Sequence, residues 1–426
     1  MSVSSSACPI PVGGNIIALI VNRLRNTLRS PLSIIRIYFF LWFAGSSFLS
    51  PYLPIFYQGR GLSGFQIGLL SSIGFAVGIL AAPQWGRWAD RMSAPQRLLQ
   101  LAIPVSIASY LFLSRQTMFL PIVGIVILNS IFSAAQEPVS AALAIRATRS
   151  TGSGFGSVRV WGSLGWSLLV WVAGWWIQNT TIQAAFYGFA ASMMAGWFVL
   201  WLLKPGSPPR PAENASPPAM LSGSASTASS SRHRPIPALL AAVLMLWIAV
   251  AGVRQFETLY FKRLGAGTDL IGFTAMLSAL VELPSMFASD WLTRRFGAHR
   301  VLIAGMFLDG LIRGLVLIWP SIPVLIAVRM VVGISFSMTT IGMVAYVQEY
   351  VPHDQQTRAV ALYTVVIRNI VYLFSNPLTG AIFDAFGGYW LYAIALVGNF
   401  LGGTILLLAR SPKHADPQQI PQPSGR

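Results

Sequence analysis

The stretch GRWADRMSAPQR, residues 86–97, is the most informative part of this sequence for the fold. It joins two long apolar runs, although it is rich in charged residues in a chain of which only 10% is charged. Gly86 permits a close approach of two helices, Asp90 can face a helix N-terminus, and Arg91 can pair with an acid or a lipid headgroup. The stretch therefore predicts a charged connection between two membrane-spanning helices.

Apolar runs like these two recur along the whole chain, and 54% of its 426 residues are hydrophobic. A helix needs roughly 20 apolar residues to cross the hydrocarbon core of a bilayer. The pattern predicts an all-α membrane protein with twelve spans. These spans are 32–57, 64–86, 97–115, 117–145, 156–178, 183–203, 236–262, 269–293, 300–319, 321–350, 357–383 and 388–409.

The net charge of +17 is explained by the membrane and not by nucleic acid. With the N-terminus in the cytoplasm, few of the 29 Lys and Arg residues fall in outward loops, namely Arg60, Arg115, Lys262 and Arg263. Most of the others fall in inward loops and tails, as the positive-inside rule requires. We therefore expect a multi-pass protein of the cell membrane with both termini cytoplasmic, and no nucleic-acid partner.

A polar stretch rich in Pro, Ser and Ala, residues 204–235, separates the sixth span from the seventh. It predicts a cytoplasmic linker between two six-helix halves. The expected organisation is a cytoplasmic tail 1–31, a half 32–203, the linker 204–235, a half 236–410 and a cytoplasmic tail 411–426.

The two halves also resemble each other at a constant offset of 204 residues. Tyr57, Gly61, Ile67 and Gly68 match Phe261, Gly265, Ile271 and Gly272, and Arg91 matches Arg295. Two similar halves around a midplane cavity are typical of secondary transporters that work by alternating access.

Residues 86–97 resemble the G-x-x-x-D-R/K…R/K loop of the major facilitator superfamily. Gly86, Asp90, Arg91 and Arg97 supply the pattern, while Ser93 stands where glycine is common. The resemblance implies the major facilitator fold and assigns these four residues to a cytoplasmic gate. The second copy, residues 290–300, has Asp290 for the glycine and Arg294 for the aspartate, so we expect a weaker gate there.

A second stretch, GFGSVRVWGSLGW at 154–166, resembles the fifth helix of lactose permease and of the related phenylpropionate and nucleoside permeases. The resemblance implies that Arg159 and Trp166 face the central cavity and bind substrate. Their seven-residue spacing also puts them on one helix face, where a guanidinium and an indole suit hydroxyl, carboxylate or ring ligands. The alternative is that Arg159 snorkels to the inner headgroups.

The sequence departs from lactose permease at that family's sugar-binding and coupling residues. The sugar-binding glutamate falls on Ala141, and the coupling histidine and glutamate fall near Val332 and Ser335. Lactose-type recognition is therefore absent. Glu137, one helical turn before Ala141, is the candidate substitute.

Ionisable side chains within the predicted spans are costly, so they should face a cavity or a partner. Besides Arg159, those that lie well inside the spans are Glu137, Arg254, Glu257, Glu282, Asp309, Arg313, Arg329 and Arg368. Arg254–Glu257 and Asp309–Arg313 have the spacing of local ion pairs, which can be purely structural. We expect Arg313 and Arg368 to join Arg159 and Trp166 at the substrate, and Arg329 to snorkel or to brace neighbouring helices.

Glu282, in ALVELPSMF, is the strongest candidate for proton coupling, together with Glu137. No base lies within a turn of Glu282, and burial favours the protonated form of a carboxyl, which lets it exchange a proton near neutral pH. Similar E-x-P-x-M-F sequences occur in the aromatic-acid permease relatives. The alternative is a salt bridge to Arg313 or Arg159 without a transported proton.

These observations predict a monomeric, proton-coupled secondary transporter whose partners are a small polar or anionic solute, protons and the lipid bilayer. Nothing indicates an enzyme, a cofactor or a metal: the four histidines fall in predicted loops or tails, Cys8 is the single cysteine, and no nucleotide-binding loop occurs. The alternatives are a proton-driven efflux carrier for amphipathic compounds and a non-transporting receptor on the same fold.

Overall fold

The computed structural model describes residues 30–149, 154–203, 236–352 and 355–409. The predicted linker 204–235 and nearly all of the two predicted tails lie outside these ranges. The described chain is helical and contains no strand. It includes twelve helical segments long and apolar enough to cross a membrane, as predicted.

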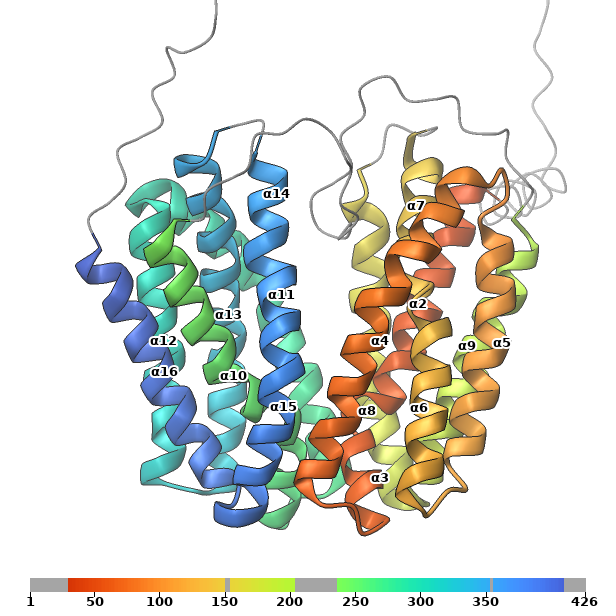
Figure 1. The fold of residues 1–426 in the computed structure, drawn as a ribbon, viewed down its shortest axis with the longest axis horizontal. Helices are drawn as coiled ribbons and strands as arrows, with labels where there is room; N and C mark the ends of the chain where they lie inside the picture. Colours follow the sequence, from red (N-terminus) through yellow and green to blue (C-terminus); the bar gives the residue numbers. More distant parts are fainter. Residues whose placement is uncertain (1–29, 150–153, 204–235, 353–354, 410–426) are drawn as a thin grey trace, which may run out of the picture.

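The first half is built from helices that run up and down through the predicted spans (Figure 1). They are α2 (Pro31–Leu49), α3 (Leu53–Gly59), α4 (Gly64–Arg91), α5 (Gln96–Leu113), α6 (Phe119–Ser133), α7 (Gln136–Arg149), α8 (Gly156–Asn179) and α9 (Gln183–Trp201).

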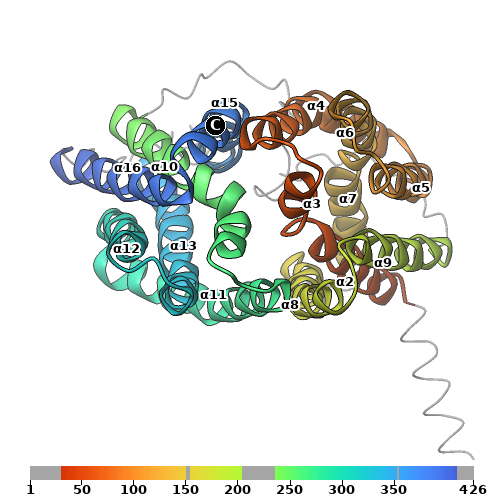
Figure 2. The same ribbon diagram turned by 90° about the horizontal axis from the view of Figure 1, so that it is seen from below.

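The second half repeats this arrangement beside the first, and the view along the helices separates the two bundles clearly (Figure 2). Its helices are α10 (Pro237–Arg263), α11 (Thr268–Phe296), α12 (Ala298–Ile318), α13 (Ile322–Tyr350), α14 (Gln356–Ala361), the π-helix η1 (Leu362–Val366), α15 (Ile367–Phe386) and α16 (Gly388–Leu408).

Three predicted spans are interrupted in ways that their lengths did not reveal. The first breaks between α2 and α3, where Pro51 lacks the N–H that a continuous helix needs. The fourth breaks between α6 and α7, at Ala134–Ala135, just before Glu137. The eleventh contains η1 just before Arg368, and such π segments often occur at functional sites.

The predicted loop 86–97 is mostly helical. α4 continues to Arg91, so Gly86, Asp90 and Arg91 lie in its last two turns, and Arg97 lies in the first turn of α5. The helix extends this far because Arg146 of α7 donates hydrogen bonds to the terminal carbonyls of Ala89 and Met92, each at 3.1 Å. An added Cβ at Gly86 would lie 3.7 Å from Pro138, an ordinary contact, so no close helix approach requires this glycine in the described conformation.

The two halves meet near one end of the molecule and diverge toward the other (Figure 1). We call the end with the turns at Gly61 and Gly265 the closed end, and the end where α4 finishes and α5 begins the open end. Gly61 and Gly265 have φ values of +82° and +88°, which an L side chain rarely adopts. These equivalent turns bear out the repeat seen in the sequence.

Close helix contacts hold the closed end together. α4 packs against α15, and α8 packs against α11. A Cβ at Gly68 would overlap the carbonyl oxygen of Asn376 across the first contact, and a Cβ at Gly272 would overlap that of Val170 across the second. The repeat-related glycines therefore make equivalent contacts between the halves.

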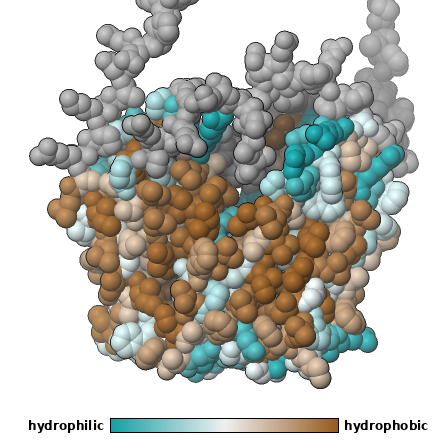
Figure 3. Space-filling model, viewed as in Figure 1, coloured by the Kyte–Doolittle hydropathy of each residue, from teal (hydrophilic) through white to brown (hydrophobic). Residues whose placement is uncertain are grey.

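Hydrophobic side chains cover the middle of both halves on the face drawn in Figure 3, and hydrophilic side chains gather toward the ends. A hollow separates the halves at the open end. This pattern is typical of a protein whose apolar middle part lies in the hydrocarbon core of a bilayer.

Candidate functional site

A cavity of about 910 Å³ lies between the two halves. Its wall runs from Ser50 and Pro51, at the α2–α3 break, to Asp90 near the open end of α4. Residues of α3, α4, α5, α6, α7, α10, η1 and α15 complete the wall. Because both halves contribute, a solute bound here would contact each of them.

Three charged side chains from within the spans line this cavity, namely Glu137, Arg254 and Arg368. Local helix irregularities precede two of them, because α7 starts one residue before Glu137 and η1 ends two residues before Arg368. A π-helical turn inserts an extra residue into the helix and so rotates the side chains that follow. Ala141, one helical turn after Glu137 on α7, also lines the cavity, so the two positions share this wall.

Arg159 of α8 and Glu282 of α11 are half-buried and are not among the residues that line this cavity. Both interact electrostatically with residues that line the cavity. Arg159 interacts with both Glu137 and Glu282. Glu282 also interacts with Arg254, and Arg368 interacts with Arg254 and Glu137.

These interactions form a closed circuit, which we call the charge ring: Glu137, Arg159, Glu282, Arg254 and Arg368. None of the five makes an ion pair within 4.0 Å in the described part of the chain. With both acids ionised, the ring carries a net charge of +1. The protein therefore keeps uncompensated charge beside a cavity between its halves.

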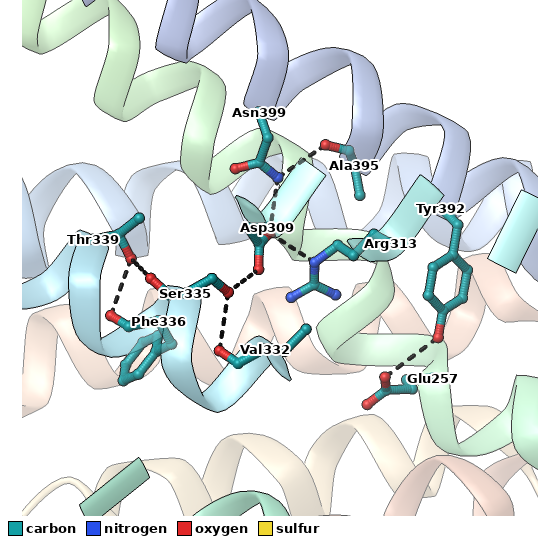
Figure 4. Close-up of polar contacts among 10 residues, drawn as sticks. All are labelled: Glu257, Asp309, Arg313, Val332, Ser335, Phe336, Thr339, Tyr392, Ala395 and Asn399. Atoms are coloured by element: carbon teal, nitrogen blue, oxygen red, sulfur yellow. Dashed lines mark hydrogen bonds and ion pairs between the residues drawn. The ribbon is translucent and has the colours of Figure 1, made fainter. Parts of the chain in front are cut away.

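The remaining charges within the spans form ion pairs inside the second half. Arg313 donates from Nε to Asp309 at 2.7 Å, and both side chains are buried. Ser335 and Asn399 donate to the same carboxylate at 2.9 Å each (Figure 4). The predicted Asp309–Arg313 pair is confirmed, and its extra hydrogen bonds indicate a structural role.

The sequence predicts that Arg329 either snorkels or braces neighbouring helices, and the structure shows that it braces them. It bonds to Glu257 of α10 at 2.7 Å, and its Nη1 donates to the carbonyl of Ile271 and to the hydroxyl of Thr274 on α11. The predicted Arg254–Glu257 pair is therefore wrong, because Glu257 is taken by Arg329. Arg254 is left exposed within the cavity wall.

The structure separates the predicted substrate-binding residues. Arg368 lines the cavity, whereas Arg313 is only 7% exposed and is held by Asp309. Trp166 is half-buried on α8 and is not among the lining residues. Arg159 packs over the ring of Phe43 at 4.6 Å, so α2 shields one face of its guanidinium.

Glycines explain how Arg159 comes so close to α2. A Cβ at Gly165 would overlap the carbonyl oxygen of Phe40, and a Cβ at Gly162 would lie 2.8 Å from the Phe43 ring. The small residues of the 154–166 stretch therefore allow α8 to pack closely against α2. This packing places the guanidinium of Arg159 over the ring of Phe43.

Sequence reasoning missed Arg254, Gln255 and Asn369 as cavity residues. The acid three residues after Arg254 suggests a local ion pair and not a cavity position. The sequence feature that does indicate a functional position is the place of Arg254 within a long apolar run. Gln255 donates to Ser71 of α4 at 2.8 Å and so links the halves, whereas Asn369 accepts a bond from its neighbour Arg368 at 3.4 Å.

The predicted gate residues Asp90, Arg91 and Arg97 are exposed at the open end, and Asp90 lines the cavity. In the second copy, Arg294 bonds instead to Asp290 in its own helix at 2.6 Å. No cluster of His, Cys, Asp or Glu in the described ranges has the arrangement of a metal site.

Comparison with known proteins identifies the chain. The model of the MFS_1 like family matches residues 32–394. The chain belongs to the MFS_1 like family. It is thus a transporter of the major facilitator superfamily, a multi-pass membrane protein with the fold expected from residues 86–97.

Two relatives of this MFS_1 like protein have different names. It is 26% identical to a maltose permease of Geobacillus stearothermophilus over 375 residues, covering 87% of this chain and 93% of that one. It is also 26% identical to a multi-drug resistance efflux pump PmrA homolog of Lactococcus lactis over 387 residues, covering 84% and 89%.

Two solved structures share the fold. The nucleoside transporter NupG superposes with a TM-score of 0.72 at 14% identity, covering 88% of this chain and 97% of that one. A bacterial homologue of the iron transporter ferroportin, in an inward-facing state, superposes with a TM-score of 0.68 at 14% identity, covering 88% and 98%. These likenesses establish the architecture and leave the substrate to the site itself.

Proposed function

We propose that this chain is a proton-coupled symporter that brings a small polar or anionic organic solute into the cell by alternating access. The charge ring carries the proposal. Three of its five side chains line the cavity between the halves, and none of the five makes an ion pair in the described chain, whereas the other four charges well inside the spans are paired. Unpaired charge within a membrane protein costs free energy, and such residues typically bind a substrate or exchange a proton.

The direction of the cavity follows from the positive-inside rule. Arg87, Arg91, Arg97, Arg146, Arg294, Arg295 and Arg300 lie near the open end, whereas Arg60, Arg115, Lys262 and Arg263 lie near the closed end. On this basis the open end faces the cytoplasm, so the conformation is inward-open. Both chain termini then lie in the cytoplasm, and the membrane is the cell membrane.

Glu137 and Glu282 are the proposed coupling acids. Each interacts electrostatically with Arg159 and with one further arginine of the ring. Protonating either acid frees the positive charge of its neighbours, which makes the site more attractive to an anion. A proton and an anionic solute would then bind together, which is the thermodynamic basis of symport.

Gradient-driven uptake into proteoliposomes tests this proposal. We expect an inward proton gradient to drive accumulation of at least one solute from a panel of organic acids, sugars and nucleosides. Glu282→Gln should abolish accumulation while keeping counterflow exchange, because exchange needs no net proton movement. Asp290→Asn, at an exposed ion pair, is the matched control and should transport normally.

Proton-driven efflux of amphipathic compounds is the second candidate, favoured by the similarity to the PmrA homolog. In that case no panel solute accumulates, and amphipathic cations move out of the vesicles against their gradient. Accumulation of a panel solute that does not change when the proton gradient is collapsed would overturn proton coupling while leaving transport intact.

A further inference from the structure

The order of charges in the ring contains one like-charged junction. Going around, Glu137 interacts with Arg159, Arg159 with Glu282, and Glu282 with Arg254. Arg254 then interacts with Arg368, and Arg368 returns to Glu137. Four of the five neighbouring pairs are of opposite charge, and only Arg254 and Arg368 repel each other.

Arg254 and Arg368 also differ from the other arginines within the spans in their surroundings. Both line the cavity. Arg313 and Arg329 lie in ion pairs, and Arg159 is covered by Phe43. The side chain of Arg254 has no hydrogen bond or ion pair to any residue that the structure describes, and it is exposed.

Arg368 is held in place by its neighbours. Its guanidinium lies 5.8 Å from the centre of the Trp247 ring, and its Nε donates to the Asn369 side chain at 3.4 Å. An arginine anchored by an indole and through Nε keeps its outer nitrogens for a ligand. Arg254 comes from α10 and Arg368 from α15, two helices that pack against each other within the second half.

We propose that the carboxylate of the transported solute binds between Arg254 and Arg368. This inference rests on the proposed function and narrows it to organic anions that carry a single carboxylate. A guanidinium matches the planar carboxylate with two parallel hydrogen bonds, and one negative charge cancels the net +1 charge of the ring. It also relieves the repulsion at the one like-charged junction.

Both arginines belong to the second half, whereas the cavity is lined by both halves. Side chains of the first half would therefore complete the site from across the cavity. Glu137 of α7 interacts with Arg368, and Gln255, next to Arg254, bonds to Ser71 of α4. An anion at the arginine pair competes with Glu137 for Arg368. Binding of the solute would thus loosen one link across the cavity, and protonation of Glu137 would favour binding.

Matched ligand pairs test the site in purified full-length protein. Benzoate is compared with benzamide and gluconate with glucitol, by ligand-induced thermal stabilisation and by quenching of tryptophan fluorescence. We expect a carboxylate to bind and its neutral partner not to bind. Arg254→Gln and Arg368→Gln should each weaken carboxylate binding at least about tenfold, the effect of losing a hydrogen bond to a charged group.

Two further variants keep the test informative. Arg254→Lys retains the charge without the planar fork and should fall between the wild type and Arg254→Gln. Arg87→Gln, at an exposed position of α4, should bind as the wild type does. A monodisperse gel-filtration peak for each variant separates loss of binding from loss of fold.

The outcomes distinguish this inference from the proposed function. The inference is overturned if no carboxylate binds more tightly than its neutral partner, or if both glutamine variants keep full affinity. Gradient-driven accumulation of a sugar or nucleoside would then still support the symporter. Carboxylate binding that depends on both arginines, without accumulation of any solute under a proton gradient, would retain the anion site and reject symport.

Discussion

Asp384 and Gln178 cap two helices of the opposite half at equivalent places in the repeat. The carboxylate of Asp384, on α15, accepts hydrogen bonds from the first two backbone N–H groups of α4, at 2.7 and 2.9 Å. The amide oxygen of Gln178, on α8, accepts a bond from the first N–H of α11 at 2.8 Å. Both contacts bridge the halves at the closed end, but only Asp384 brings a charge to a helix N-terminus.

Replacing Asp384 with Asn should therefore favour opening of the closed end. A helix N-terminal cap is worth about 0.5–2 kcal/mol, which corresponds to a severalfold change in the balance between conformations. In a Cys8→Ser background, a cysteine at Ser50 in the cavity wall reports opening through its labelling by an impermeant maleimide. We expect faster labelling from the closed side in Asp384→Asn, and slower labelling in Gln178→Glu.

Equal labelling rates with and without the Asp384→Asn substitution would exclude a role of this charge in closure. Asp290→Asn serves as the control, because it removes a carboxylate from an exposed pair near the opposite end of the molecule.

Enlarging Gly68 should prevent the closed end from forming. Gly68→Leu would force the side chain into the backbone of Asn376, and the closest approach of α4 and α15 would be lost. We expect a folded protein that binds solute from the closed side yet fails to transport it. Gly124→Ala, where a Cβ meets nothing within 4 Å, should transport normally. Normal transport by Gly68→Leu would contradict the proposed closure contact.

The two classes of arginine within the spans should differ in their effect on stability. Arg329→Gln leaves the largely buried carboxylate of Glu257 with only the Tyr392 hydroxyl as partner, at a cost of up to about 3–5 kcal/mol, whereas Arg254→Gln removes no side-chain bond in the described chain. Thermal unfolding in detergent should therefore show a large loss of stability only for Arg329→Gln. Adding Glu257→Gln to that variant should restore part of it. A loss as large in Arg254→Gln would mean that Arg254 has a structural role.

Arg159→Ala should abolish specific uptake without unfolding the protein. The guanidinium contacts two acids of the charge ring electrostatically and packs on Phe43, but it forms no ion pair with a described residue. Its loss removes a positive charge that interacts with both Glu137 and Glu282, which changes proton binding by these acids. Uptake into proteoliposomes and gel filtration measure the two effects. Wild-type uptake by the folded variant would remove Arg159 from the site.

Much of the fold was predictable because a bilayer imposes strict rules on sequence. The length of apolar runs predicted all twelve spans, and the repeat predicted equivalent turns at Gly61 and Gly265. Breaks inside spans were not predictable from hydropathy. The interruption before Glu137 and the π segment before Arg368 leave the apolar pattern intact, because they change hydrogen bonding and not composition.

The candidate site was predictable in its residue types and not in its pairings. Nine charged residues well inside the spans are evident from the sequence alone, because such residues stand out in apolar runs. Which of them are neutralised depends on how the helices pack. Glu257 forms its ion pair with Arg329 of α13 and not with its sequence neighbour Arg254. The partners of an ion pair are brought together by helix packing and not by sequence spacing alone. That choice leaves Arg254 beside Arg368 at the cavity.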